Sequence, residues 1–186
     1  MRKNLALTVL SLLVLPCILL TQACAPETRP GLQKPLSFEA VTFTSENPAY
    51  TLQYPKSWVV KPLPLAGRSV LYAAASDDLA ADSLSIFVAD PVDDVASTLK
   101  EGISRLPSFV ADNATANIVS VMPVLMADGK EATEVILKAK VATYDIWFYC
   151  YAFNRDGKTI CFIGDTLGGD SSKALIKEIA HTLKSK

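Results

Sequence analysis

Short stretches in which apolar and polar residues alternate occupy much of the chain after residue 37, and this spacing predicts β-strands. The first predicted strands are Ala40–Thr44, Tyr50–Tyr54, Trp58–Val60, Val70–Ala75 and Leu84–Ala89. In the second strand, Tyr50, Leu52 and Tyr54 fall on one side, because successive strand residues point to opposite faces. We therefore expect these three side chains to share one face of the sheet.

The second half of the chain predicts two β-hairpins. Their four strands are Ile118–Met126, Glu131–Lys140, Tyr144–Phe153 and Lys158–Gly164. The first pair flanks Asp128-Gly129, and an Asp-Gly pair between strands is a strong hairpin signal. The second pair flanks Asn154-Arg155-Asp156-Gly157. The strand Tyr144–Phe153 is apolar on both sides, so we expect both faces of the sheet centre to be covered.

Two segments have the apolar spacing of amphipathic helices. In the first, apolar residues recur from Val95 to Leu106, after the acidic pair Asp93-Asp94 and before a proline. In the second they recur from Leu175 to Leu183, with Ser171 or Ser172 as the expected N-cap. The order of strands, helix, strands and helix is typical of an α+β fold. We therefore predict a mainly antiparallel β-sheet flanked by helices, in a single globular domain over residues 37–186.

The first 24 residues have the layout of a bacterial export signal. Arg2 and Lys3 supply two positive charges, and the 16 residues Leu5–Leu20 are almost wholly apolar. Thr21-Gln22-Ala23-Cys24 follows and resembles a lipobox, the sequence at which a cysteine is lipidated and becomes the first residue. We therefore predict a signal peptide over residues 1–23 and lipidation of Cys24, which would anchor the exported protein to a bacterial membrane.

Two other interpretations of this segment stay open. A retained transmembrane helix would need about 20 apolar residues, and Pro16 interrupts the shorter run found here. Cleavage by the ordinary signal peptidase would fall after Ala25, because Ala23-Cys24-Ala25 has the required small-x-small form. That cut would leave Pro26 as the first residue, which disfavours this peptidase. Lipidation of Cys24 is the favoured interpretation.

Residues 24–36 predict a tether between the lipidated Cys24 and the domain. The segment contains Pro26, Pro30, Gly31 and Pro35 and shows no periodic apolar spacing. Such a composition is typical of a flexible or semi-extended spacer. The alternative is an ordered arm packed on the domain, which the scarcity of apolar residues disfavours.

The charge balance argues against nucleic acid as a partner. The chain has 18 basic and 19 acidic residues, a net charge of −1. Residues 1–23 hold two basic residues and no acidic one, so the predicted mature protein carries −3. Neutralising a phosphate backbone requires a basic excess. We therefore expect no binding of nucleic acid.

One local motif resembles a known family. The stretch Tyr50-Thr51-Leu52-Gln53-Tyr54-Pro55-Lys56-Ser57-Trp58 resembles the opening signature of PsbP-like domains, and the order of elements matches over about residues 38–184. The family includes a photosystem II extrinsic subunit and bacterial DcrB-type lipoproteins. The resemblance implies an antiparallel sheet between helices, an α/β/α sandwich. It assigns no catalytic or binding residue, because the motif consists of a strand, a proline turn and an aromatic anchor.

Candidate catalytic residues are scarce. His181 is the only histidine, and it lies near the end of the last predicted helix, where a cation is favoured by the helix dipole. A single histidine excludes a His-rich zinc site, and no nucleophile elbow, P-loop or G-x-G-x-x-G is present. We therefore predict that the protein is not an enzyme and has no cofactor.

Acidic residues gather in the predicted loops. They are Asp77, Asp78, Asp82, Asp90, Asp93 and Asp94. Their oxygens are the ligands that calcium prefers, but the spacing of an EF-hand is absent. We expect these carboxylates to be solvated or to lie at a helix start, and we predict no metal site. A calcium-like site beside the acidic loop is the alternative.

Cys150 and Cys161 lie on the two strands of the second hairpin, in an exported protein where a disulfide is permitted. If Asn154 pairs with Lys158, Cys161 lies on the opposite face of the sheet from Cys150 and no bridge can form. A loop of four residues would instead place the two cysteines opposite each other. The Asn-x-Asp-Gly turn favours the first register, so we predict buried free thiols.

These observations predict an exported, membrane-anchored lipoprotein of the cell envelope. We expect its non-catalytic domain to bind a protein partner or to support an envelope assembly. The alternative is a lipoprotein that binds a small ligand or a calcium-like metal.

Overall fold

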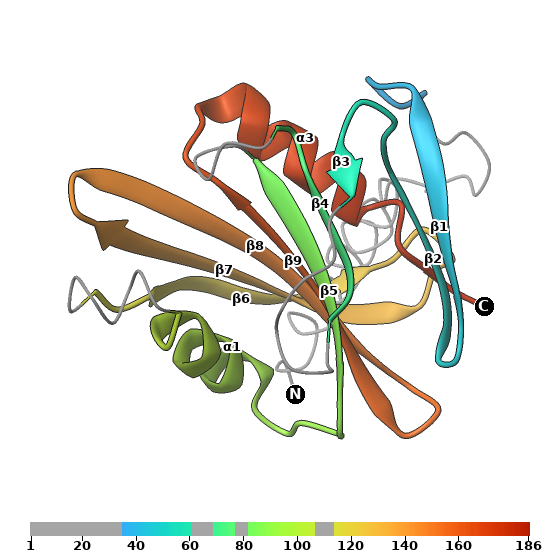
Figure 1. The fold of residues 1–186 in the computed structure, drawn as a ribbon. Helices are drawn as coiled ribbons and strands as arrows, with labels where there is room; N and C mark the ends of the chain where they lie inside the picture. Colours follow the sequence, from blue (N-terminus) through green and yellow to red (C-terminus); the bar gives the residue numbers. More distant parts are fainter. Residues whose placement is uncertain (1–34, 61–68, 77–81, 107–113) are drawn as a thin grey trace, which may run out of the picture. The chain divides into compact units, whose positions relative to one another are not determined.

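A computed structural model of the protein describes residues 35–60, 69–76, 82–106 and 114–186 (Figure 1). Residues 36–186 form one compact unit. The predicted signal peptide, Cys24 and nearly all of the predicted tether lie outside the described residues.

The described strands form two antiparallel sheets. The smaller sheet has the order β1-β2-β10, with β1 at Ala40–Glu46, β2 at Ala49–Pro55 and β10 at Lys184–Ser185. The larger sheet has seven strands in the order β3-β4-β5-β9-β8-β7-β6. Their bounds are Val59–Val60 for β3, Ser69–Ala74 for β4, Ser83–Ala89 for β5, Lys158–Thr166 for β9, Tyr144–Arg155 for β8, Glu131–Val141 for β7 and Asn117–Leu125 for β6.

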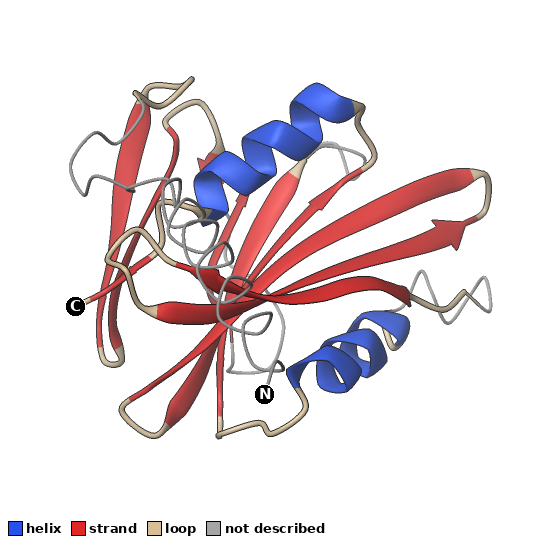
Figure 2. Cartoon of the chain, turned by 180° about the vertical axis from the view of Figure 1, so that it is seen from behind, coloured by secondary structure: helices blue, strands red, loops and turns tan. Residues whose placement is uncertain are grey.

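Helices lie on both faces of the larger sheet (Figures 1 and 2). Helix α3, Asp170–Ala180, packs on β9, β8 and β2, whereas α1, Val95–Ser104, packs on β6 and β7. The predicted α+β fold with a mainly antiparallel sheet flanked by helices is therefore confirmed. The strands fall into two sheets, because the fully buried Leu183 leads the chain from α3 into β10, which pairs with β2.

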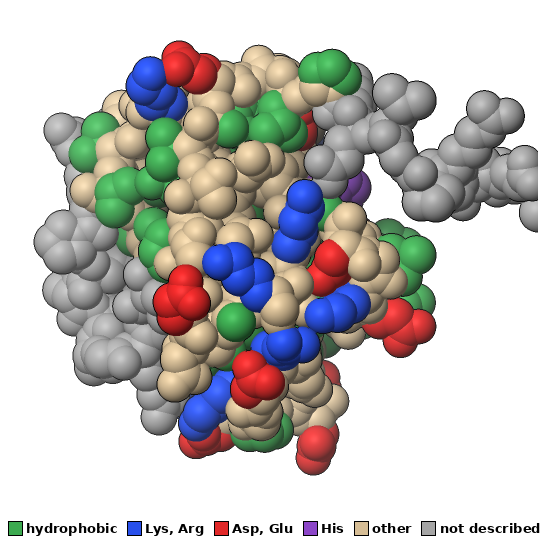
Figure 3. Space-filling model, turned by 90° about the vertical axis from the view of Figure 1, so that its right-hand side faces the viewer, with side chains coloured by type: hydrophobic (Ala, Val, Ile, Leu, Met, Phe, Trp, Pro, Cys, Tyr) green, Lys and Arg blue, Asp and Glu red, His purple; other side chains and the backbone are tan. Residues whose placement is uncertain are grey.

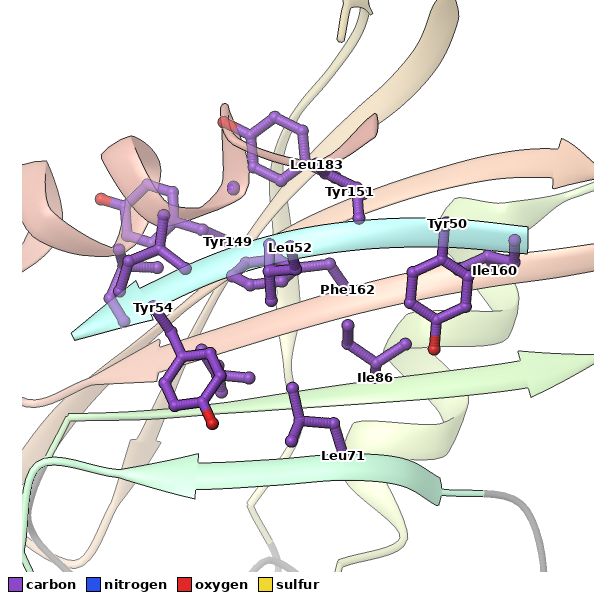
Figure 4. Close-up of a cluster of buried hydrophobic side chains, with 14 of the residues drawn as sticks. Tyr50, Leu52, Tyr54, Leu71, Ile86, Tyr149, Tyr151, Ile160, Phe162 and Leu183 are labelled. Carbon is purple, nitrogen blue, oxygen red and sulfur yellow. The ribbon is translucent and has the colours of Figure 1, made fainter. Parts of the chain in front are cut away.

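The larger core lies between β2, α3 and one face of the seven-stranded sheet. Tyr50, Leu52 and Tyr54 point from β2 toward central side chains such as Ile86 and Phe162 (Figure 4). All three are at most 8% exposed and belong to one core, so the prediction that they share one face is confirmed. A second core joins α1 to the opposite face of the sheet. Both faces of β8 are thus covered, as its two-sided apolar sequence predicts.

The turn after β2 anchors the chain at the edge of the larger core. The Trp58 N–H donates to the Pro55 carbonyl at 3.0 Å, and the Lys56 N–H donates to the Glu39 carbonyl at 2.8 Å. The Trp58 side chain is 7% exposed and belongs to the core. The motif Tyr50–Trp58 is therefore a structural anchor, as its resemblance to PsbP-like domains implies.

The turn between β8 and β9 is tighter than the sequence predicts. Arg155 pairs with Lys158, so the loop consists of Asp156 and Gly157 alone, with φ of 51° and 69°. Positive φ at both positions is the mark of a type I′ turn, whose twist matches that of the strands. The predicted pairing of Asn154 with Lys158 is wrong, because Asn154 pairs with Thr159. The Thr159 hydroxyl donates to the Asn154 side chain at 2.8 Å and stabilises this pairing.

Helix α1 begins where the sequence predicts. The Asp94 Oδ1 accepts a hydrogen bond from the Ser97 N–H at 3.0 Å, which satisfies one donor of the first turn. This bond lowers the pKa of the Asp94 carboxyl. Leu99 and Ile103 form the buried stripe of the helix.

Helix α3 begins two or three residues earlier than expected. Its N-cap is Gly169, which makes no side-chain capping bond, so the prediction of Ser171 or Ser172 as the cap is wrong. A Cβ added at Gly168 would lie 2.3 Å from the Ser172 Oγ. Ser172 therefore packs closely against the preceding turn, and Asp170 supplies the negative charge that favours the helix start.

The β8–β9 turn gives a test of the register. We expect Gly157→Ala to lower the free energy of unfolding by about 1–2 kcal/mol, because a side chain is disfavoured at positive φ. Gly102→Ala in α1 is the matched control, since both sites have open space around an added Cβ. There the free energy should rise by about 0.5–1 kcal/mol. Urea unfolding measures both, and an unchanged stability of Gly157→Ala would contradict the assigned turn.

Candidate binding surface

His181 lies at the end of α3, where its ring is exposed and packs edge-on to Tyr151 with 5.9 Å between ring centroids. This placement agrees with the position that the sequence predicts. The described part of the chain contains no group of three or more His, Cys, Asp or Glu residues that could hold a metal ion. That His181 is not catalytic stays a prediction.

Most of the described acidic residues that the sequence analysis singled out form hydrogen bonds or ion pairs with nearby residues. Asp77 and Asp78 lie outside the described residues. Asp82 accepts a hydrogen bond from the Thr166 hydroxyl, and Asp90 pairs with Lys158 at 2.7 Å. Asp94 caps α1, and Asp93 is exposed just before it. The arrangement of the described acidic residues therefore gives no support to the alternative of a calcium site.

Sequence reasoning missed the half-buried carboxyl of Asp165. This residue faces Ser83 across the β5–β9 pair, and the Ser83 hydroxyl donates to its Oδ1 at 2.6 Å. Burial raises the pKa of Asp165 to about 6, with a smaller contribution from Asp82, while the Ser83 hydrogen bond opposes the shift. No sequence signal could have found it, because only the register shows that this side chain faces inward.

Cys150 and Cys161 are free thiols, as predicted. Their predicted placement on opposite faces is wrong. Cys150 pairs with Ile163 and Cys161 with Ala152, so the two cysteines share one face and sit diagonally across neighbouring strands. Burial raises the pKa of Cys161 to about 11 and that of Cys150 well above its ordinary value. Both thiols are therefore protonated, and weak nucleophiles, at neutral pH.

Helix α3 is held on β8 by three aromatic contacts at regular intervals. The pairs are Lys173 Nζ over Trp147 at 4.8 Å, Lys177 Nζ over Tyr149 at 5.1 Å, and the edge-on packing of His181 on Tyr151. Four helix residues rise by about 6.0 Å and two strand residues by about 6.8 Å, so the helix and the strand keep nearly the same spacing. We call these three contacts the α3–β8 ladder.

Two neighbouring features tighten the α3–β8 ladder. A Cβ added at Gly164 of β9 would lie 2.3 Å from the Ile176 Cγ2, so the missing side chain lets α3 approach the sheet. The Tyr151 hydroxyl donates to the carboxylate of Glu134, which is 5% exposed. Burial and this carboxylate raise the pKa of Tyr151 above its ordinary value. The lysines of the α3–β8 ladder thus help to hold α3 on the sheet.

The clearest candidate for binding is the edge strand β6. It borders only β7 within the described sheet, and it carries no charged residue over Asn117–Leu125. Five of its large hydrophobic side chains are exposed: Ile118 40%, Val119 53%, Val121 49%, Met122 46% and Leu125 68%. We call these five residues the β6 apolar surface. Monomeric proteins usually protect such an edge with charges, so the β6 apolar surface is the candidate for an interface.

The sequence contains the signal for this surface but not its location. The pattern of Ile118–Met126 predicts a strand, and its lack of charge is equally typical of a buried central strand. The pairing order alone shows that it lies at an edge. Val121 and Met122 point to opposite faces, so the exposed apolar character extends over both sides of the strand.

Charged side chains elsewhere are mixed in sign. On the side of the molecule that carries β1 and β2, basic and acidic side chains are interspersed (Figure 3). Ion pairs of Lys56 with Glu39 at 2.6 Å and of Lys186 with Glu46 at 3.8 Å contribute to this pattern. Among the helices that the structure describes, none is long and apolar enough to cross a membrane.

The fold is similar to that of two solved proteins. No family model matches the sequence, and no curated protein matches it either. The solution structure of cyanobacterial PsbP (CyanoP) from Synechocystis sp. PCC 6803 is 13% identical, with a TM-score of 0.62 over 84% of this chain and 98% of that one. A mutant of the protein Mog1 is 8% identical, with a TM-score of 0.53 over 80% of this chain and 96% of that one.

At these identities the likeness establishes the fold alone. The PsbP-like fold, which the Tyr50–Trp58 motif implies, is thus confirmed. Lipidation, export and the choice of partner stay predictions.

Asp165 gives a test by pH. Its raised pKa means that the folded protein keeps a proton between about pH 4 and pH 6 that the unfolded chain has released. The free energy of unfolding should therefore fall as pH rises through this window, by about 1–3 kcal/mol. In Asp165→Asn, which keeps an acceptor for Ser83, this fall should disappear. Urea unfolding from pH 4 to pH 7.5 measures it, and parallel curves for both proteins would contradict the assignment.

Proposed function

We propose that this protein is an exported lipoprotein, anchored to a bacterial membrane through Cys24, whose non-catalytic PsbP-like domain binds another protein chain through β6. The observation that carries the proposal is the β6 apolar surface. Five large hydrophobic side chains, each at least 40% exposed, lie on one uncharged edge strand. An edge strand of this kind binds by adding a strand to its sheet, with side-chain contacts on both faces.

The state of the titratable groups supports binding over catalysis. Glu134 is bonded to Tyr151 and Asp165 to Ser83, while both described thiols have raised pKa values. A general base or nucleophile acts best when its pKa lies near the working pH and its reactive atom is open to substrate. These groups instead fulfil structural roles in the sheet and under α3.

The first described residues are fixed on α3, which would give the proposed tether a defined point of attachment. The Ser37 N–H donates to the Glu178 carboxylate at 2.7 Å, and the Ser37 hydroxyl donates to the same carboxylate. Phe38 packs against the larger core. The domain therefore begins at a fixed point on α3, and a tether from Cys24 would start from there.

The anchor can be tested by mass spectrometry of the membrane fraction. We expect the mature amino terminus to be a lipidated Cys24, because the apolar segment and the Thr21-Gln22-Ala23 run precede it. The variant Cys24→Ala should move the protein out of the membrane-bound, lipid-modified pool. An unmodified amino terminus at Pro26, or a retained Met1, would overturn the lipoprotein assignment.

Binding through β6 can be tested by chemical crosslinking of the tagged full chain in intact cells. We expect Val121→Lys to reduce the crosslinked protein adducts at least about tenfold, because an unpaired charge in an apolar interface costs several kcal/mol. Val60→Lys in β3 is the matched control, since both valines lie on edge strands and are about half exposed (49% and 51%). Adducts that survive Val121→Lys would refute a role for β6.

A further inference from the structure

We infer that the chain that pairs with β6 is a second copy of this protein, joined antiparallel about a two-fold axis at Val121. The inference rests on the proposed function, because it names the partner for the same strand. Three features of β6 support it: the backbone groups that point outward from the sheet, the positions of the bulge residue Val119 and of Pro123, and the lack of charge.

The outward backbone groups of β6 follow from the pairing. In an antiparallel ladder, alternate residues direct their N–H and C=O groups to opposite neighbours. Pro123 has no N–H, and proline within a sheet is confined to positions whose nitrogen faces away from the ladder. Pro123 therefore belongs to the outward set, and so do Val121 and Leu125, two residues to either side. These residues offer the edge on which a further strand can pair.

A two-fold axis at Val121 aligns the irregularities of the strand with each other. The pairing of β6 with β7 shifts register between Ile118 and Ser120, so Val119 is the extra residue of a bulge. An axis at Val121 places Val119 of one copy opposite Pro123 of the other. Pro123, which has no N–H to donate, then lies opposite the bulge, where the hydrogen bonding is already irregular. An axis at Pro123 would place two prolines opposite each other and remove both central hydrogen bonds.

The same axis matches side chains by size. Val121 of each copy would lie beside its equivalent on the face that carries α1. On the other face, Met122 of one copy would lie opposite Ser120 of the other, so a large side chain meets a small one. The two α1 helices would flank the axis on one face of a continuous sheet. Pairing along nine residues would extend over roughly 30 Å.

Charge also favours a second copy. Two identical strands that carried charges near the axis would repel each other, but Asn117–Leu125 has none. The other long edge strand, β1, carries Glu46, which pairs with Lys186. Pairing of β6 with β1 would be heterologous and would continue into an open chain of molecules. Pairing of β6 with β6 closes after two copies.

Cysteine crosslinking of the full chain in its membrane tests this geometry. Val121→Cys would place two thiols at a directly opposed pair, about 5.5 Å apart at Cα, within reach of a disulfide. Leu125→Cys is the matched control, since its side chain is more exposed but its two copies would lie about 27 Å apart. Copper phenanthroline with oxygen accepts the two electrons as the two thiols lose their protons and join.

We expect Val121→Cys to give a disulfide-linked species of twice the monomer mass, in at least about tenfold higher yield than Leu125→Cys or the parent chain with its native cysteines. Equal yields from the two variants would indicate random collision and overturn the inference. An adduct of Val121→Cys with a different protein would overturn it while upholding the proposed function. No adduct would also overturn it.

Sedimentation of the detergent-extracted full chain supplies a second measurement that requires no new thiol. We expect the parent chain and Val60→Lys to sediment as dimers and Val121→Lys as a monomer of unchanged circular dichroism. A parent chain that sediments as a monomer would overturn the inference. If crosslinking in cells still depended on Val121, the proposed binding function would stand although the inferred dimer did not.

Discussion

The pairing of β8 with β9 through the turn Asp156–Gly157 determines where most other side chains lie. Strand residues alternate between two faces, so a slip of one residue would exchange the faces of a whole strand. The observed register puts Phe162 in the core under α3 and puts Cys161 on the opposite face. The same alternation passes through β7 to β6 and turns the backbone of Val121 outward.

Local patterns in the sequence predicted the elements, and the contacts between elements decided what the patterns could not. Tyr50–Tyr54 and the stripe Leu99–Ile103 were predictable because each depends on the spacing within one element. The β8–β9 register was not, since Asn154–Gly157 is compatible with several loop lengths. The start of α3 was missed because it depends on the close approach of Gly168 to Ser172.

The candidate surface illustrates the same division. The sequences of β6 and β8 are both apolar, yet β8 lies inside the sheet between β9 and β7, whereas β6 lies at its edge. The apolar side chains of β8 are covered on both faces and stabilise the fold, whereas those of β6 are exposed, and there we propose an interface. The charged and hydroxyl groups around α3 are engaged with one another, as Glu134 is with Tyr151. In the proposed function, recognition by the described residues would therefore depend on shape and apolar area.

The hydrogen bonds from Ser37 to Glu178 determine how mechanical force would enter the domain. They fasten the chain to α3 before β1 begins at Ala40. Tension applied ahead of Leu36 would act first on the Ser37–Glu178 hydrogen bonds and on α3. The α3–β8 ladder would then transmit it to β8 within the larger sheet. The edge strand β1, whose bonds would otherwise unzip one after another, is shielded from the pull. A domain held by one end can therefore bear tension through an inner strand of its larger sheet.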